Sequence, residues 1–156
     1  MSKLLSETAN LRVAIAAGAD LYNGNPTSDR FNMADYERAA FVVHHDAGAT
    51  GTATFTVVAS SDAAGTGAEA IPFRYRVHGV TAEPGAITEA AAAGFTIAAG
   101  ADQIAIVEIA ADACPDGKPF VALVATEVAD SPVAGCVMMA MTGARYTDGA
   151  PPAAVS

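Results

Sequence analysis

Hydrophobic and polar residues alternate in the middle of the chain. From residue 52 to residue 60 every second position is apolar, and most of the positions between carry a hydroxyl group. The apolar set is Ala53, Phe55, Val57 and Ala59, and the hydroxyl set is Thr52, Thr54, Thr56 and Ser60. Because successive side chains of a strand point to opposite faces, this pattern predicts a strand that buries one face only.

A second alternating stretch runs from residue 71 to residue 78. Its expected inward residues are Ile71, Phe73, Tyr75 and Val77, and its expected outward residues are Arg74, Arg76 and His78. The stretch from 39 to 45 is apolar on both faces, which is typical of a central strand packed on two sides. Short loops rich in Gly, Ser, Thr and Asp separate the three stretches, so residues 39–77 are predicted to form an antiparallel β meander.

Other segments complete the prediction of eight or so short strands. Residues 31–38 favour a tight lead-in to the strand at 39–45 rather than a helix, and residues 87–92 favour a short surface helix. Further strands are expected at 11–17, 95–98, 103–110, 120–128 and 131–142, the last two forming a final hairpin. The predicted fold is all-β, an antiparallel β-sandwich or jelly-roll-like barrel with one or two short helical turns. Residues 1–10 form an N-terminal arm, 11–146 the sandwich domain and 147–156 an extended C-terminal tail.

The composition and net charge indicate the kind of core and exclude some kinds of partner. The 156 residues are 52% hydrophobic but only 6% aromatic, with no Trp, which indicates a thin core of small side chains between two stacked sheets. A net charge of −9 disfavours direct nucleic-acid binding and suits contact with a basic partner surface. No run approaches the roughly 18 apolar residues of a membrane span, and residues 1–10 are too short an apolar run for a signal peptide. We therefore expect a protein made in the cytoplasm, with no membrane partner.

Candidate chemistry is sparse. His44 and His45 would point to opposite faces of a strand and so could not ligate one metal ion together. Cys114 and Cys136 match no zinc or redox spacing, and Cys114, in a loop, is expected to be the more reactive thiol. No nucleophile elbow is found, so we expect neither an enzyme nor a cofactor.

Charges in strands are the better candidates for function. Arg74 and Arg76 share the polar face of one strand, while Glu108 and Glu127 interrupt strands that are otherwise apolar. Such charges form cross-strand pairs within one subunit or lie at a boundary between subunits, and the sequence leaves both readings open. Likewise, Met138, Met139 and Met141 fit core filling or a soft contact surface. The predicted interface residues are Arg74, Arg76, Glu108, Glu127 and Cys114.

Three segments together resemble a family of structural proteins. They are the YERA sequence at 36–39, the hairpin at 51–77 and the closing segment at 131–146, which ends in Arg145 and Tyr146. In these segments the chain is similar to the head decoration or minor capsid proteins of tailed bacteriophages.

The resemblance implies a virion structural protein on the capsid surface, made in the host cytoplasm. Its partners would be the major capsid protein and itself, as a homotrimer, and Arg145 and Tyr146 join the predicted interface residues. We also expect residues 1–10 or 147–156 to make intersubunit contacts, and an intermolecular disulfide through Cys114 is one possibility. Two alternatives stay open: a phage tail or neck subunit of the tube or connector type, and a carbohydrate-binding or adhesion module.

Overall fold

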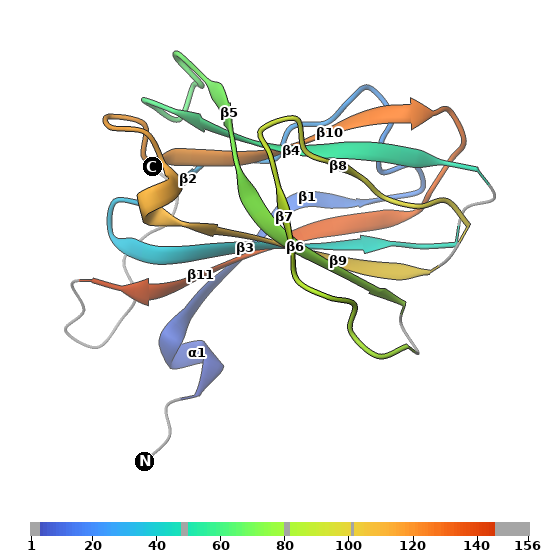
Figure 1. Ribbon diagram of the computed structural model, residues 1–156, viewed down its shortest axis with the longest axis horizontal. Helices are drawn as coiled ribbons and strands as arrows, with labels where there is room; N and C mark the ends of the chain where they lie inside the picture. The colour runs from blue at the N-terminus through green and yellow to red at the C-terminus, as the bar shows by residue number, and fades with distance from the viewer. Residues whose placement is uncertain (1–3, 48–49, 80–81, 101, 146–156) are drawn as a thin grey trace.

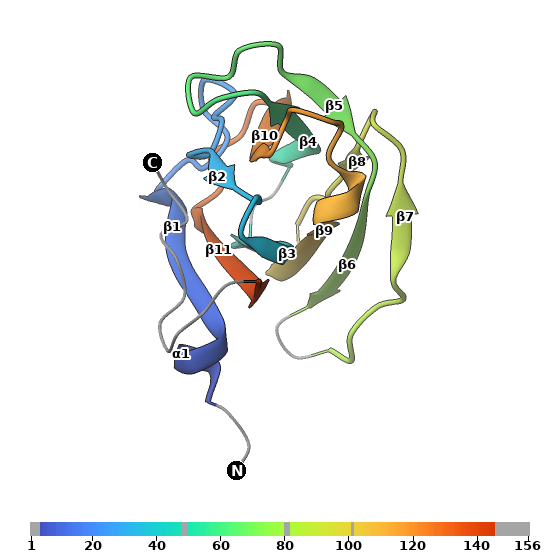
Figure 2. The same cartoon turned by 90° about the vertical axis from the view of Figure 1, so that its left-hand side faces the viewer.

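The protein is a sandwich of two antiparallel sheets (Figure 1), seen in a computed structural model that describes residues 4–47, 50–79, 82–100 and 102–145. The six-stranded sheet has the order β1 (Ala9–Gly18), β11 (Gly135–Ala144), β3 (Tyr36–His45), β9 (Gln103–Ala110), β6 (Phe73–Gly79) and β7 (Thr88–Ala90). The five-stranded sheet has the order β2 (Phe31–Asn32), β10 (Phe120–Ala129), β4 (Thr52–Ser60) and β5 (Glu69–Ile71), with β8 (Phe95–Thr96) also paired to β4. The predicted all-β sandwich is confirmed, and Figure 2 shows its two layers from the side.

The core lies between the sheets and confirms the alternation on β4, whereas Tyr75 and Val77 of β6 are only half-buried. All four apolar residues predicted to face inward on β4 are fully buried, at 0% exposure. Phe95 links the layers, since its ring stacks on Tyr75 of the other sheet at a centroid distance of 3.8 Å. The Phe95 ring also contacts Phe73 and Phe55. A few aromatic rings thus join two sheets whose other inner residues are small, as the composition indicated.

The meander predicted for residues 39–77 is wrong. β3 pairs with β9 and β11, whereas β4 lies in the other sheet and pairs with β10 and β5. β5 is followed by Pro72, which has no amide hydrogen to donate to a ladder, and the chain then enters the six-stranded sheet as β6. Alternation identifies the buried face of a strand, but it does not identify the strand's neighbours.

The final hairpin is wrong for a related reason. β10 belongs to the five-stranded sheet and β11 to the six-stranded sheet, so residues 130–134 cross from one layer to the other. Two backbone hydrogen bonds hold this crossing. The amide of Leu21 donates to the carbonyl of Val133 (2.7 Å), and the amide of Asp46 donates to the carbonyl of Ala134 (2.9 Å).

The helix predicted at 87–92 is also wrong, because Thr88–Ala90 form β7. Cross-strand pairing with β6 outweighs the helix propensity of the alanines there. The tight lead-in to β3 is confirmed, as the amide of Tyr36 donates to the carbonyl of Met33 (3.1 Å).

The two short helices lie elsewhere. α1 (Leu5–Thr8) falls within the predicted N-terminal arm, and η1 (Ala111–Ala113) follows β9. β1 begins at Ala9, within the predicted arm, and the predicted tail at 147–156 lies outside the described residues. Within the described ranges, no helix has the length and apolar character needed to cross a membrane.

Candidate docking surface

The outer face of the six-stranded sheet carries an aliphatic patch. It is formed by Leu11 and Val13 of β1, Cys136, Met138 and Ala140 of β11, Ala40 and Val42 of β3, and Ile104 and Ile106 of β9. By contrast, the outer face of the other sheet is rich in hydroxyl groups, and there Thr54 and Thr96 are hydrogen-bonded at 2.7 Å. Hydroxyl groups form hydrogen bonds with water, whereas aliphatic groups are more stable when they are removed from water. The hydroxyl-rich face is therefore suited to solvent, and the aliphatic patch to contact with another apolar surface.

Strand register makes the aliphatic patch continuous. Ile106 lies opposite Val42, Val42 opposite Met138, and Met138 opposite Val13, giving one row across four strands. Three steps between strands span about 14 Å at the usual spacing. At the β1 end of the row, Val13 is 60% exposed and Met138 is 41% exposed. An aliphatic row of this length on a sheet surface is typical of a surface that another chain covers.

A charged border adjoins the aliphatic patch. It consists of Arg38 of β3, Arg74 and Arg76 of β6, Glu89 of β7 and Glu108 of β9. We call the aliphatic patch and this charged border together the docking face. On the docking face Arg76 lies opposite Ile106 and continues the aliphatic row, while Arg74 lies opposite Glu108 in the neighbouring row.

The sequence left open whether the strand charges pair within one subunit or lie at a boundary between subunits, and Arg74 answers part of this question. Its guanidinium makes an ion pair within the subunit at 3.0 Å, but the partner is Glu89 and not the register neighbour Glu108. Both side chains are mostly exposed, at 66% and 78%, so the pair contributes little to stability. These charges are therefore accessible to another surface.

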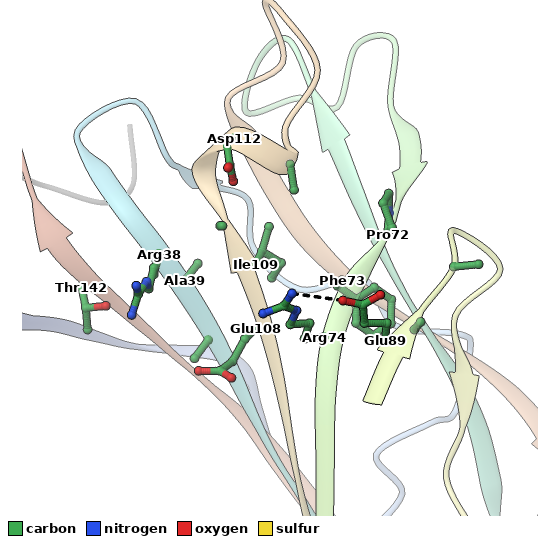
Figure 3. Close-up of a pocket in the computed structure, with 15 residues that line it drawn as sticks. Arg38, Ala39, Pro72, Phe73, Arg74, Glu89, Glu108, Ile109, Asp112 and Thr142 are labelled. Carbon is green, nitrogen blue, oxygen red and sulfur yellow. Dashed lines mark hydrogen bonds and ion pairs between the residues drawn. The ribbon is translucent and has the colours of Figure 1, made fainter. Parts of the chain in front are cut away.

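An open hollow of about 970 Å³ lies among these charges, where β3, β6, β7 and β9 meet η1 (Figure 3). Arg38, Arg74, Glu89, Glu108 and Asp112 are its charged lining residues. Figure 3 shows Arg38 on one side of Glu108, and the ion pair between Arg74 and Glu89 on the other. Alternating signs of this kind suit recognition of a charged surface with a matching pattern.

The six-stranded sheet is also the less acidic part of the molecule. Its strands carry four arginines and three glutamates, a net charge of +1, whereas the chain as a whole carries −9. The residues counted are Arg12, Arg38, Arg74 and Arg76, and Glu37, Glu89 and Glu108. An acidic partner therefore meets less repulsion here than the net charge of the protein indicates.

Glu127, by contrast, lies on β10 in the other sheet, away from the docking face. Its amide donates to Oδ1 of Asn25 at 2.8 Å. Desolvation, with smaller contributions from Asp130 and Asp20, raises the pKa of the Glu127 carboxyl. The structure does not bring Glu127 together with Arg74, Arg76 and Glu108.

Cys114 and Arg145 meet at a second, smaller hollow of about 270 Å³. Cys114 is half-buried against the core rather than exposed, and desolvation, with the charge of Asp112, raises the pKa of its thiol. Arg145 is exposed, and its amide donates to the carbonyl of Asp35 at 2.9 Å. Tyr146 lies outside the described residues.

The two histidines do point to opposite faces. His45 is fully buried and His44 faces outward, with its Nε2 at 3.1 Å from Oδ1 of Asp102. Among the described residues, no three His, Cys, Asp or Glu side chains are placed to hold a metal ion.

Sequence reasoning missed the aliphatic patch as a surface, although a signal was present. A stretch apolar on both faces, such as 39–45, predicts a strand covered on both sides, and its outer face proves to be partly exposed.

Comparisons with protein-family models, curated proteins and solved structures found no match to this chain.

Proposed function

We propose that this chain is a virion structural protein that decorates and stabilises the outer surface of a phage capsid. It binds the lattice of the major capsid protein and works as a homotrimer. The observation that carries the proposal is the docking face, where a continuous aliphatic patch adjoins a border of accessible charges. Burial of the aliphatic patch favours association between copies, and the charges of the border select the capsid partner and its orientation.

The segments that resemble phage head proteins also support the proposal. Residues 36–39 begin β3, and residues 131–146 include β11. These two strands are neighbours in the six-stranded sheet. The hairpin segment at 51–77 includes β6, which carries Arg74 and Arg76. Six of the fourteen residues of the docking face thus lie in the segments on which the resemblance depends: Arg38, Arg74, Arg76, Cys136, Met138 and Ala140.

The charged border is the part we assign to the capsid protein. Arg74 and Arg76 project from one strand with Glu108 beside Arg74, and the open hollow gives a neighbouring chain access to Arg74 and Glu108. An acidic segment of the capsid protein, carrying one basic residue opposite Glu108, would complement this border.

The test is binding to capsids of the encoding phage that lack this protein. Purified protein is mixed with the capsids, and the bound fraction, its copy number and the temperature of capsid disruption are measured. We expect saturable binding at high copy number and a higher disruption temperature. Arg76→Glu should lose most of the binding, whereas Lys118→Glu, the same charge change away from the docking face, should retain it.

Two results would count against the proposal. If wild-type protein does not sediment with capsids, decoration is wrong. If it is found at a few copies at the neck or along the tail, the tail or neck alternative replaces decoration.

A further inference from the structure

The helix α1 presents apolar side chains that its own subunit does not cover. Leu4 at its N-cap is 67% exposed and Leu5 is 63% exposed, and none of the helical residues is buried. A four-residue helix is far too short to be stable by itself in water. Local capping helps, because the amide of Leu4 donates to the Glu7 carboxylate at 2.6 Å, but the leucines are mostly exposed and their packing contributes little.

α1 also stands away from the body of the protein. Figures 1 and 2 both show it beyond the end of β1, below the six-stranded sheet. It leads directly into β1, whose residues Leu11 and Val13 form one margin of the aliphatic patch, and these are 47% and 60% exposed. The exposed leucines of α1 thus precede the exposed margin of the patch by only a few residues of chain.

In the part of the chain that the structure describes, each copy thus presents an exposed apolar helix and a partly exposed apolar patch. Neither covers the other within a subunit, because Leu4 and Leu5 are exposed and so are Leu11, Val13 and Met138 at one margin of the patch, while its other residues are half-buried. In a pair of copies, α1 of one copy can cover the aliphatic patch of the other, and each copy has as many helices to offer as patches to cover. The charges agree, since the strands of the six-stranded sheet sum to +1 and the single charge of α1 is the acidic Glu7.

We propose that α1 of one copy packs on the aliphatic patch of the next, with Leu4 and Leu5 placed against the row of Val42, Ile106 and Met138. This inference rests on the self-association named in the proposed function and gives it a surface. The contact joins two different surfaces of the protein, and such a head-to-tail contact forms a ring such as the homotrimer when its rotation closes. The charged border stays free for the capsid protein.

The first test measures association in solution by sedimentation equilibrium. We expect wild-type protein to form an oligomer, and Leu4→Ser with Leu5→Ser to weaken association by about 100-fold or more. The double variant should fold normally, because neither leucine is buried, and circular dichroism checks this. The matched control is Ile87→Ser with Val128→Ser, which removes two similarly exposed apolar residues outside the patch and α1 and should associate as the wild type does.

The second test uses Cys136, which lies within the aliphatic patch. Its alkylation by iodoacetamide, followed by peptide mass spectrometry, should slow as protein concentration rises. Alkylation of Cys114, which lies outside the patch, should be independent of concentration. In the Leu4→Ser, Leu5→Ser variant, Cys136 should react at one rate at all concentrations.

Several outcomes would overturn the inference. They are a monomeric wild type at all concentrations, a double variant that associates as tightly as the wild type, and Cys136 alkylation that is independent of wild-type concentration. Protection of Cys136 that is removed by deleting residues 147–156 would assign the patch to the tail of the same chain instead. Capsid binding by a monomer overturns this inference and the homotrimer but leaves capsid decoration standing, whereas an α1-dependent oligomer that does not bind capsids overturns only the decoration function.

Discussion

The hydroxyl oxygen of Tyr22 lies 2.5 Å from Nδ1 of His45, and both side chains are fully buried in the core. Tyr22 belongs to the loop after β1 and His45 is the last residue of β3, so the hydrogen bond ties this loop to the six-stranded sheet. The other ring nitrogen, Nε2, is buried without a hydrogen-bond partner among the described residues. Water does not reach the ring, so the neutral form of His45 is favoured.

The stability of the protein should therefore depend on the charge of His45. Desolvation lowers the pKa of His45 below its ordinary value of 6.5; the charge of His44 adds to this effect, and Asp102 and Asp46 oppose it. Below pH 6.5 the unfolded chain takes up a proton that the folded chain resists. The free energy of unfolding should fall as the pH drops from 7.5 to 5, by at most about 1.4 kcal/mol per pH unit for this group.

Urea denaturation at a series of pH values measures this effect. His45→Gln should be less stable than wild type at pH 7.5 but should lose less stability on acidification. His78→Gln, which replaces an outward-facing histidine of β6, should keep the wild-type dependence. Equal pH dependence of wild type and His45→Gln would show that His45 is not the group responsible.

Removal of the Tyr22 hydroxyl should destabilise the fold. Tyr22→Phe keeps the ring and its edge contact with Phe55 but leaves Nδ1 of His45 unpaired in the core. The expected loss in the free energy of unfolding is about 1–3 kcal/mol. Tyr75→Phe, which preserves the ring stack with Phe95, is the control and should cost less than about 1 kcal/mol. Chemical denaturation compares the two, and equal losses would contradict a special role for the Tyr22 hydroxyl.

Truncation of Phe55 tests the alternation on β4. Its ring is fully buried and contacts Tyr22 and Phe95, so Phe55→Ala should cost about 3–5 kcal/mol. Thr56→Ala changes the next residue, on the outer face, and should cost about 0.5 kcal/mol or less. Thermal unfolding of both variants measures the difference, and similar losses would mean that the two faces of β4 are not distinguished by burial.

Period-two patterns predicted the strands well, because the face to which a strand residue points follows from its position relative to its neighbours in the sequence. Phe55 and Phe73 were placed inward and are buried. The pairing of strands could not be predicted in the same way, because it depends on how the chain crosses between layers. Pro72 and the crossing at 130–134 decide this, and neither leaves a periodic signal.

The docking face was only partly predictable. Arg74, Arg76 and Glu108 were identified from sequence and do lie together, since charges in strands are unusual enough to stand out. Glu127 has the same appearance in sequence but lies in the other sheet. The aliphatic patch required knowledge of which strands are neighbours, because Val42 and Met138 are 96 residues apart in the chain and opposite each other in the sheet.

Gly94 should be the least replaceable of the glycines with positive φ that we compare. Its φ is +82°, and a Cβ atom there would overlap the carbonyl oxygen of Phe55 on β4. Gly117 has a similar φ of +75°, but a Cβ atom there would meet no atom within 4 Å. Both Ala variants incur the strain of a left-handed conformation, about 1–2 kcal/mol, and only Gly94→Ala also forces β4 to move.

The difference between the stability losses of the two variants thus measures the cost of crowding between residue 94 and β4. Gly117→Ala should lose about 1–2 kcal/mol in the free energy of unfolding. Gly94→Ala should lose several kcal/mol, because displacement of Phe55 also disturbs its ring contact with Phe95. Urea denaturation measures both losses. If Gly94→Ala is no less stable than Gly117→Ala, the turn before β8 does not lie against β4 as tightly as the structure shows.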